Sequence, residues 1–337
     1  MIFLEPLSPA RPPKHANIAI FVPHLGCPRQ CSFCEQNAIT GANHAPPPTP
    51  EDVLLAAETA ADSLDGRHRE AEIAFFGGSF TAIDRAYMLA LLEAAKAAVE
   101  RYGFGGIRCS TRPDAVDPEV LELLGRYGVT AIELGAQSMD DGVLRANRRG
   151  HTAADTVRAA ELIRAGGFEL GLQMMTGLYQ DTAKQDLDTA RRLVALKPAT
   201  VRIYPTLVLS GTELARLYER GEYRPQSLEQ AAELCALLLE EFLRAGVRVI
   251  RVGLHAGRDL EEKYLAGPYH PAFRQLAESL AYRKRLFREL ERFGPGEYTV
   301  EVEPRELSTV LGQRKANCKE LERRGYHVTF RQAEGRG

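Results

Sequence analysis

The sequence predicts an α/β fold built on a parallel sheet, and two observations support that class. Strand-like apolar runs alternate with longer helical patterns over about 240 of the 337 residues, as in parallel strands joined by crossover helices. Hydrophobic residues make up 45% of the chain, so it can bury a large core. A doubly wound sheet and a (β/α) barrel both fit. In either fold, the loops after the strands form the active face.

Seven short apolar runs are predicted to be strands. They are Asn17–Pro23, Glu72–Phe76, Ile107–Ser110, Ala131–Leu134, Leu170–Met175, Thr200–Tyr204 and Val247–Val252. Apolar residues at three- and four-residue spacing predict helices between them. These include Glu51–Leu64, Arg85–Arg101, Thr152–Ala165 and Ser227–Ala245. Polar residues that suit helix starts precede three helical runs, at Asp140, Thr152 and Ser227.

The alternation ends after about residue 256. A helix is expected near Phe273–Phe293, and Gly294, Pro295 and Gly296 then break the chain. The remainder is predicted to be strand, helix, helix and strand: Tyr298–Val302, Arg305–Leu311, Ala316–Arg324 and His327–Arg331. We therefore expect three parts, namely the main domain at 1–256, a loop and helix at 257–295, and a small basic module at 296–337.

The net charge of −2 averages two unlike parts of the chain. Residues 281–337 contain 13 Lys and Arg against 9 Asp and Glu, a net charge of +4, so the rest carries −6. The near-neutral total excludes a globally basic nucleic-acid coat but allows a local basic face. No apolar run approaches the roughly 20 residues of a membrane span, and no signal-peptide pattern begins the chain. We therefore expect a cytoplasmic protein.

Three of the six cysteines lie close together. Cys27, Cys31 and Cys34 have the spacing C-x3-C-x2-C directly after the first predicted strand. Three thiolates can ligate three irons of a [4Fe–4S] cluster and leave the fourth iron open for a ligand. The competing interpretation is zinc bound by the same cysteines and His24. The scattered cysteines are expected to pack as small core residues; they are Cys109, Cys235 and Cys318.

The cysteine segment and six others carry a resemblance to a known family. In order, they are HLGCPRQCSFC, FFGGSFT, STRPDAV, ELGAQSMDDGVL, RRGHT, GLQMMTGL and VRIYPTLVLSGTEL. Together they resemble the radical core of the Elongator catalytic subunit and its bacterial relatives, within the radical S-adenosylmethionine (SAM) enzymes. The resemblance covers about residues 15–250. It implies a partial, six-strand (β/α)6 TIM-like barrel.

The resemblance also implies the cofactors and the residues that hold them. Cys27, Cys31 and Cys34 would bind a [4Fe–4S] cluster, whose open iron would bind SAM and reduce it to give a 5′-deoxyadenosyl radical. The SAM contacts are expected at Phe33, Gly77, Gly78, Ser79, Ser110, Gln137, Arg149, Gln173 and Met174. Tyr204 is expected to face the substrate and is the candidate catalytic residue. A reduced flavodoxin or ferredoxin is the expected electron donor.

Two departures from the family pattern limit what can be carried over. Ser110 stands where the Elongator subunit has an acidic residue that contacts the ribose, so a weaker or water-bridged contact is expected, and Asp114 is expected to make a local turn contact instead. The chain also continues too briefly to include the acetyltransferase domain, and only 26 residues precede Cys27. We therefore do not expect carboxymethyl-type chemistry on wobble uridine.

The C-terminal module resembles the core of a KH domain, in which a Gly-x-x-Gly loop between two helices clamps a nucleic-acid backbone. Here the loop begins at Gly312, and Lys315 replaces the second glycine. Its cations are candidates for phosphate contacts in RNA or tRNA. They are Arg314, Lys315, Lys319, Arg323 and Arg324. The alternative is a small α/β appendage with a solvated cationic face.

The function predicted from these features is that of a radical SAM enzyme that modifies RNA or tRNA. One alternative keeps the radical chemistry but directs it at a small molecule or a peptide. The other is a zinc-stabilised, non-enzymatic RNA-binding protein.

Overall fold

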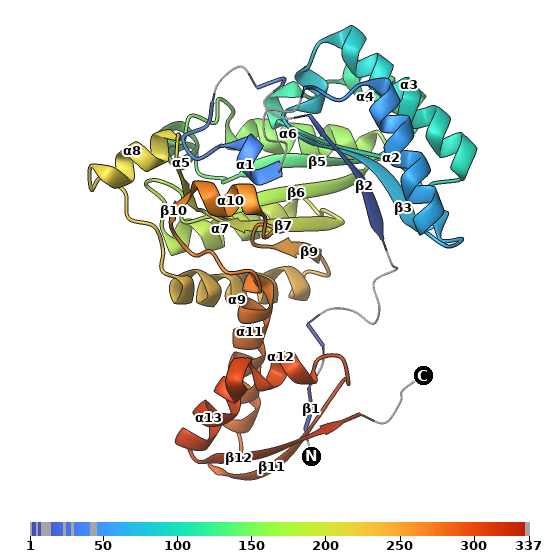
Figure 1. Cartoon of the computed structure of the whole chain (residues 1–337). Coiled ribbons are helices and arrows are strands. Elements are labelled where there is room, and N and C mark those ends of the chain that lie inside the picture. Colours follow the sequence, from blue (N-terminus) through green and yellow to red (C-terminus); the bar gives the residue numbers. More distant parts are fainter. Residues whose placement is uncertain are drawn as a thin grey trace.

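The structure is a computed structural model that describes residues 2–4, 6–7, 15–22, 25–27, 30–40 and 46–333. Its main feature is a sheet of seven parallel strands in the order β2-β3-β4-β5-β6-β7-β9 (Figure 1). They are β2 (Ala16–Val22), β3 (Ala71–Gly77), β4 (Gly106–Thr111), β5 (Val129–Gln137), β6 (Glu169–Thr176), β7 (Thr200–Pro205) and β9 (Arg248–Val252). All seven strands predicted from the sequence are present.

The sheet confirms the partial barrel, with one strand more than the resemblance implies. The added strand, β9, pairs in parallel with β7 and forms one edge of the sheet, while β2 forms the other. A two-stranded antiparallel sheet, which the sequence did not predict, pairs β8 (Val208–Leu209) with β10 (Tyr264–Ala266). The barrel is open because β2 and β9 are not joined to each other.

The helices up to the end of the barrel are α1 (Gln36–Thr40), α2 (Pro50–Ser63), α3 (Arg85–Tyr102), α4 (Pro118–Arg126), α5 (Asp141–Ala146), α6 (Ala153–Ala165), α7 (Ala183–Ala195), α8 (Glu213–Glu219), α9 (Leu228–Arg244) and α10 (Arg258–Lys263). The long helices cover the outer face of the sheet, whereas the short helices α1 and α10 contact each other over its open side (Figure 1). The three predicted helix starts are confirmed, since the side chains of Asp140, Thr152 and Ser227 accept main-chain N–H groups of α5, α6 and α9.

The main core lies between the sheet and these helices. Ile73, Phe75, Ile107, Ile132 and Leu134 on β3 to β5 are at most 1% exposed, and burying each such side chain contributes about 1.5–3 kcal/mol. Apolar side chains on one face of the parallel strands thus fix the sheet against the helices. The other face of the sheet remains available to line a cavity.

The cysteines outside the C-x3-C-x2-C segment pack as expected. Cys109 on β4 and Cys235 on α9 are fully buried, and Cys318 is half-buried. Across the described ranges, no helix combines the length and apolar character of a membrane span.

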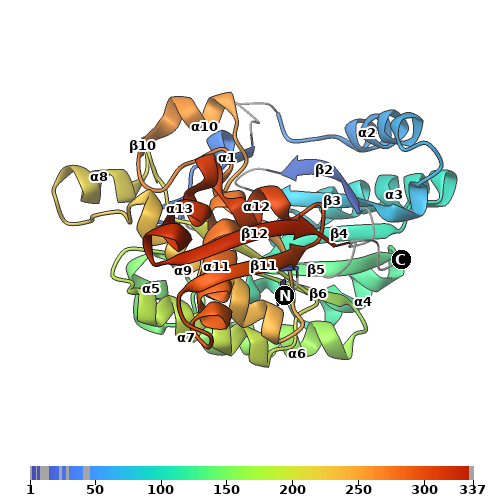
Figure 2. The same cartoon turned by 90° about the horizontal axis from the view of Figure 1, so that it is seen from below.

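A smaller three-stranded sheet forms a module below the barrel (Figures 1 and 2). Its strands are β1 (Ile2–Leu4), β11 (Gly296–Val302) and β12 (Tyr326–Gln332), and both pairs are parallel. Two helices join β11 to β12, and a long helix joins the module to the barrel; they are α12 (Leu307–Leu311), α13 (Ala316–Arg323) and α11 (Phe273–Leu290). The strand, helix, helix, strand order is therefore as predicted.

The N-terminal strand belongs to this module by its pairing, although the domain boundaries predicted from the sequence place it in the barrel. Residues of β1 pair with β11, and Leu4 and Leu7 join the module core. Tyr282 of α11 ties them together, because its hydroxyl accepts the Leu7 N–H at 2.8 Å and donates to Glu306 Oε2 at 2.8 Å. The two ends of the chain thus build one small sheet.

Candidate functional site

A cavity of about 520 Å³ lies on the inner face of the sheet, at the carboxyl ends of its strands. One end, here called the cysteine half, is formed by the cysteine segment and the residues that follow β3, β4 and β5. The other end, here called the β9 half, is formed by the residues on or just after β7 and β9. Gln173 and Met175 of β6 line the cavity between the two halves.

The cysteine half holds three free thiols on one segment, since Cys27, Cys31 and Cys34 form no disulfide. Cys27 and Cys34 line the cavity with Phe33, and Cys31 Sγ accepts a hydrogen bond from Arg149 Nη1 at 3.1 Å. Within the described residues, no three His, Cys, Asp or Glu side chains are gathered closely enough to hold a metal ion. His24, the fourth ligand of the zinc interpretation, lies outside the described residues.

Burial strongly affects these thiols. It raises the pKa of Cys34 to about 12, and the neighbouring charge of Cys31 acts in the same direction. Burial also raises the pKa of Cys27, while the positive charges of Arg112 and Arg149 oppose that rise. Thiols in such surroundings become thiolates when a cation shares the site, because metal binding reverses the electrostatic cost. The donor set therefore suits a metal or an iron–sulfur cluster.

A buried asparagine fixes the cysteine segment to the barrel. Asn147, which is fully buried, accepts a hydrogen bond from Ser32 Oγ at 2.8 Å, and its carbonyl accepts the Ser32 N–H at 3.2 Å. Its side-chain amide donates to the carbonyls of Val143 and Tyr179. Asn147 was not expected from the sequence, because nothing in its spacing links it to Ser32, which lies 115 positions earlier.

The turn after β3 approaches the cysteine segment without side chains between them. A Cβ at Gly78 would lie 2.0 Å from the Leu25 carbonyl oxygen and 3.0 Å from that of Val22. Gly77 has φ 109°, which also favours glycine. Its carbonyl accepts a hydrogen bond from Gln36 Nε2 at 2.8 Å. Both glycines line the cavity, so its wall at this turn is main chain without side chains.

Three cavity-lining residues of the cysteine half carry buried polar atoms that have no partner among the described residues. They are Ser110 Oγ, Gln137 Oε1 and Arg149 Nε. Gln137 has φ 64°, a strained backbone for a residue other than glycine, at the irregular end of β5. Buried polar groups without partners are uncommon and call for a missing ligand or water. These atoms therefore mark a polar ligand site beside the cysteines.

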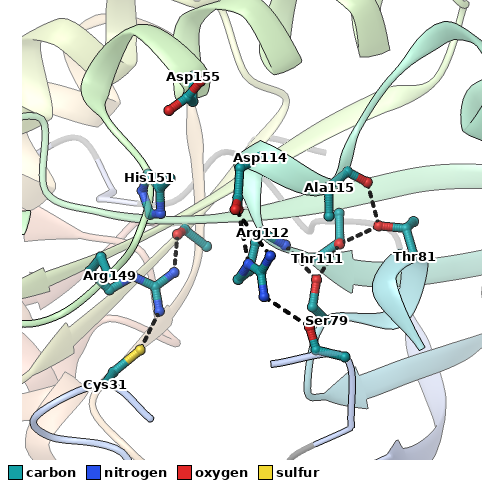
Figure 3. Close-up of polar contacts among 12 residues, drawn as sticks. Cys31, Ser79, Thr81, Thr111, Arg112, Asp114, Ala115, Arg149, His151 and Asp155 are labelled. Carbon is teal, nitrogen blue, oxygen red and sulfur yellow. Dashed lines mark hydrogen bonds and ion pairs between the residues drawn. The ribbon is translucent and has the colours of Figure 1, made fainter. Parts of the chain in front are cut away.

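Two arginines stand at this end of the cavity (Figure 3). Arg149 bridges Cys31 Sγ and the Gly135 carbonyl, which it meets at 2.7 Å. Arg112 donates to both carboxylate oxygens of Asp114, at 2.9 and 3.0 Å, and to the Gly26 carbonyl at 2.8 Å. Asp114 was expected to make a local turn contact, but the contact that the structure shows is this ion pair with the Arg112 side chain, and Asp114 does not line the cavity beside Ser110.

His151 lies close to Arg149 (Figure 3). Burial lowers the pKa of His151 to about 4, and the charge of Arg149 adds to the effect. His151 is therefore neutral near pH 7, and its Nε2 lies 3.2 Å from the Ala136 carbonyl oxygen.

Two of the predicted SAM-contacting residues do not face the cavity. Met174 is fully buried in the main core, and Met175 lines the cavity in its place. Successive side chains of a strand point to opposite faces, so Gln173 and Met175 share the inner face and Met174 does not. Ser79 is 1% exposed, and its hydroxyl is engaged by Thr111 Oγ1 at 2.8 Å and the Arg112 N–H at 3.1 Å. Ser79 therefore joins the ends of β3 and β4 (Figure 3).

A buried carboxylate supports the floor of the cavity. Glu133 of β5 is 1% exposed and accepts hydrogen bonds from Arg202 at 2.8 and 3.0 Å and from Gln173 at 3.0 Å. Arg108 lies 3.5 Å from it and also pairs with Glu72 and Glu169. This network was not predictable from the sequence, because its members come from five separate strands.

The β9 half is lined by Arg202, Tyr204, Arg251, Leu254 and His255, among others. Tyr204 lines the cavity, while its expected contact with the substrate stays a prediction. Burial raises the pKa of Tyr204, while the charges of Arg202 and Arg251 oppose that rise. Tyr204 is therefore a neutral hydroxyl at pH 7.

The candidate RNA-contacting cations of the module fall into two groups. Arg323 and Arg324 both pair with Glu320, at 2.8 and 2.9 Å, and Arg324 also lies 4.2 Å from the Phe287 ring centroid. Exposed side chains with no acidic partner among the described residues form the second group; they are Arg314, Lys315 and Lys319. Arg314 and Lys315 have φ of 51° and 58°, so this turn is strained.

Comparison with known proteins identifies the family. The Radical SAM superfamily profile matches residues 21–193, and a Radical SAM C-terminal domain profile matches residues 198–283. A tRNA uridine(34) acetyltransferase of Methanocaldococcus jannaschii is 34% identical over 127 residues, which are 37% of this chain and 24% of that protein. Human Elongator complex protein 3 is 32% identical over 176 residues, 51% of this chain and 31% of that protein. The chain thus matches about a quarter to a third of these relatives' length.

A solved structure of the archaeal Elp3 of Methanocaldococcus infernus, with an N-terminal deletion, shares the fold. Its TM-score is 0.61 at 21% identity, and the match covers 83% of this chain and 63% of that one. The superfamily profile spans half of the chain, including the cysteines, the glycine turn and the strands that line the cysteine half. The chain is therefore an enzyme of the radical SAM superfamily, similar to the radical core of the Elongator proteins.

Proposed function

We propose that Cys27, Cys31 and Cys34 bind a [4Fe–4S] cluster and that SAM binds beside it in the cysteine half of the cavity. The observation that carries the proposal is the set of unpartnered buried atoms, Ser110 Oγ, Gln137 Oε1 and Arg149 Nε, on the same cavity wall as the free thiols. Two are oxygens that accept hydrogen bonds and one is a cationic donor. A zwitterionic ligand with hydroxyl groups, such as SAM, matches that combination.

The protein groups would then divide the work of positioning. The Gly77–Gly78 turn packs directly against the Leu25 carbonyl because Gly78 has no side chain, and its main chain would meet the methionine amino group on the cavity side. Arg149 offers a cationic donor to the carboxylate, and Ser110 offers a hydroxyl to the ribose. Phe33 borders the cavity as a flat apolar surface for the adenine. When bound, the cluster supplies one electron that cleaves SAM to methionine and a 5′-deoxyadenosyl radical.

We further propose that the radical acts on RNA, with tRNA as the substrate class that the relatives' names suggest. The exposed cations Arg314, Lys315 and Lys319 support an RNA contact on the module. A reduced flavodoxin or ferredoxin would supply the electron. Tyr204, neutral and facing the cavity, would contact the nucleotide that enters it.

Anaerobic reconstitution with iron and sulfide tests the cofactor proposal. We expect about four irons per chain and, under reductant, conversion of SAM to 5′-deoxyadenosine. Cys31→Ala should abolish both, while Cys318→Ala, which alters a half-buried cysteine of the module, should leave both unchanged. A colourless protein with one zinc and no cluster would support the zinc interpretation instead.

RNA modification is tested by comparing the nucleosides of RNA from strains with and without the gene, by mass spectrometry. Loss of one modified nucleoside in the deletion strain is expected, with recovery when the gene is restored. Unchanged nucleosides from a protein that cleaves SAM would favour a small-molecule or peptide substrate.

The RNA-binding role of the module is tested with a triple variant, Arg314→Ala, Lys315→Ala and Lys319→Ala. We expect weaker tRNA binding and a shallower dependence of log affinity on log salt, by up to about 0.7–0.9 for each phosphate that the variant no longer binds. Arg323→Ala is the matched control, because Glu320 already neutralises that cation. Equal binding by the triple variant and the unaltered protein would remove the module from the proposal.

A further inference from the structure

The β9 half contains an arginine that the structure leaves without an acceptor. Four arginines line the cavity, and no Asp or Glu is among its described lining residues. Arg112 is paired with Asp114, Arg149 donates to Cys31 and Gly135, and Arg202 is paired with Glu133. Arg251 has no hydrogen bond or ion pair to any described residue, and its Nη2 is buried without a partner.

Strand register directs Arg251 and Arg202 to the same side. The two residues are partners on the neighbouring parallel strands β9 and β7, and both line the cavity. Glu133 accepts two hydrogen bonds from Arg202, which leaves no equivalent carboxylate for Arg251. Burial lowers the pKa of Arg251, and the positive charges of Arg202 and Arg274 act in the same direction. The Arg251 side chain is half-buried and its Nη2 is buried, so leaving that N–H group without an acceptor beside Arg202 costs free energy unless a ligand supplies one.

The two halves of the cavity therefore call for different ligands. The cysteine half leaves acceptors and a donor unpartnered, at Ser110, Gln137 and Arg149, whereas the β9 half leaves only a cationic donor. His255 and Tyr204 line the same half and can add further hydrogen-bond donors. A group with anionic oxygens satisfies such a set by charge-assisted hydrogen bonds.

We propose that Arg251 is the binding residue for an anionic oxygen group of the substrate, a phosphate or a carboxylate, held in the β9 half of the cavity. That the anion belongs to the substrate rests on the proposed function. The inference adds that the substrate is negatively charged and that its charged group lies in the β9 half. For an RNA substrate, the group is a phosphate next to the nucleotide that enters the cavity. Arg251 would position that nucleotide for attack from the cysteine half.

The test measures, by calorimetry, the affinity of the full-length, reconstituted protein, with SAM present, for pairs of ligands with and without an anionic group. Comparing uridine 5′-monophosphate with uridine shows whether the site binds a phosphate. Comparing glutarate with glutaramide shows whether it binds a carboxylate. The unaltered protein should bind one anion more tightly than its neutral partner. Arg251→Gln should weaken the binding of that anion by about tenfold or more. Arg251→Lys, which keeps the charge, should recover part of the affinity.

Arg248→Gln is the matched control, since Arg248 lies on the same strand but does not line the cavity. It should bind both anions as the unaltered protein does. Equal binding of charged and neutral ligands, or equal losses in Arg248→Gln and Arg251→Gln, would overturn the proposal. SAM cleavage by the unaltered protein is measured in parallel, so failure of the proposed function is recognised separately from failure of the anion site.

Discussion

The two halves of the cavity differ in what the protein itself completes. In the cysteine half, Asn147 and Arg149 hold the cysteine segment through hydrogen bonds to Ser32 and Cys31. The buried polar atoms that have no partner among the described residues of this half include both donors and acceptors. In the β9 half, Glu133 pairs with Arg202, and Arg251 has no acceptor among the residues that the structure describes. One half therefore suits a ligand of mixed polarity, and the other suits an anion. Four substitutions, in order of decreasing expected effect, test this division of the cavity and its supports.

Replacing the shared support of both halves should cost the most. Glu133→Gln would leave Arg202 without its only carboxylate and reduce the compensation of Arg108. Breaking a buried ion pair from one side destabilises a protein by about 3–5 kcal/mol. Urea unfolding of the cofactor-free protein measures the loss. Glu169→Gln, at a partly exposed partner of Arg108, should cost less than about 1 kcal/mol; equal losses would show that Glu133 is not the central support.

Filling the glycine turn should damage the cysteine half alone. Gly78→Ala places a Cβ 2.0 Å from the Leu25 carbonyl oxygen, so the turn or the cysteine segment must move. Overpacking of about 1–3 kcal/mol predicts SAM binding weakened by roughly tenfold or more, measured by equilibrium dialysis. Gly257→Ala is the control, because its Cβ would meet nothing within 4 Å. Unchanged SAM affinity in Gly78→Ala would contradict the position proposed for the cofactor.

Removing a hydrogen bond that anchors the cysteine segment should speed the loss of bound iron. Asn147→Ala removes the acceptor of Ser32 Oγ and a buried amide, at a cost of about 1–3 kcal/mol. We expect faster loss of iron to a chelator after reconstitution. Arg145→Ala, an exposed change on the same helix, is the control. Equal iron release in both variants would mean that Asn147 does not support the cysteines.

A carboxyl pair outside the cavity should add a small pH dependence. Burial raises the pKa of Asp186, and the nearby charge of Asp181 adds to it. The folded protein therefore holds this proton more tightly than the unfolded chain, so stability falls as the pH rises above the ordinary carboxyl range. Urea midpoints between about pH 6 and pH 8 should decline in the unaltered protein and less in Asp186→Asn. The exposed Asp188→Asn should keep the decline; a flat profile in the unaltered protein would refute the assignment.

The strands and helices of the barrel were predictable because their signals are local, whereas the choice of a partial barrel over a doubly wound sheet came from the family resemblance. Each strand is a short apolar run, and the cysteines and glycines that follow the first two strands are recognisable by spacing alone. Whole-strand orientation is harder, since both faces of a buried parallel strand are apolar. This is why Met174 was assigned to the face that Met175 occupies.

The remaining features depend on contacts that spacing does not show. The three-residue strand β1 gains its partner β11 almost 300 positions away. Ser79 was predicted to contact the ligand, but its hydroxyl is hydrogen-bonded to Thr111, which lies on the next strand. Arg251 is one of many arginines in the sequence, and only the distribution of carboxylates in space shows that it lacks an acceptor among the described residues.

The division of the cavity is tested most directly by a crystal structure of the anaerobically reconstituted protein with SAM. The account predicts a cluster on Cys27, Cys31 and Cys34, and SAM in hydrogen-bond contact with Ser110 Oγ, Gln137 Oε1 or Arg149 Nε. Arg251 should remain free of SAM. A SAM carboxylate bound to Arg251, or a cluster absent from these three cysteines, would contradict the account.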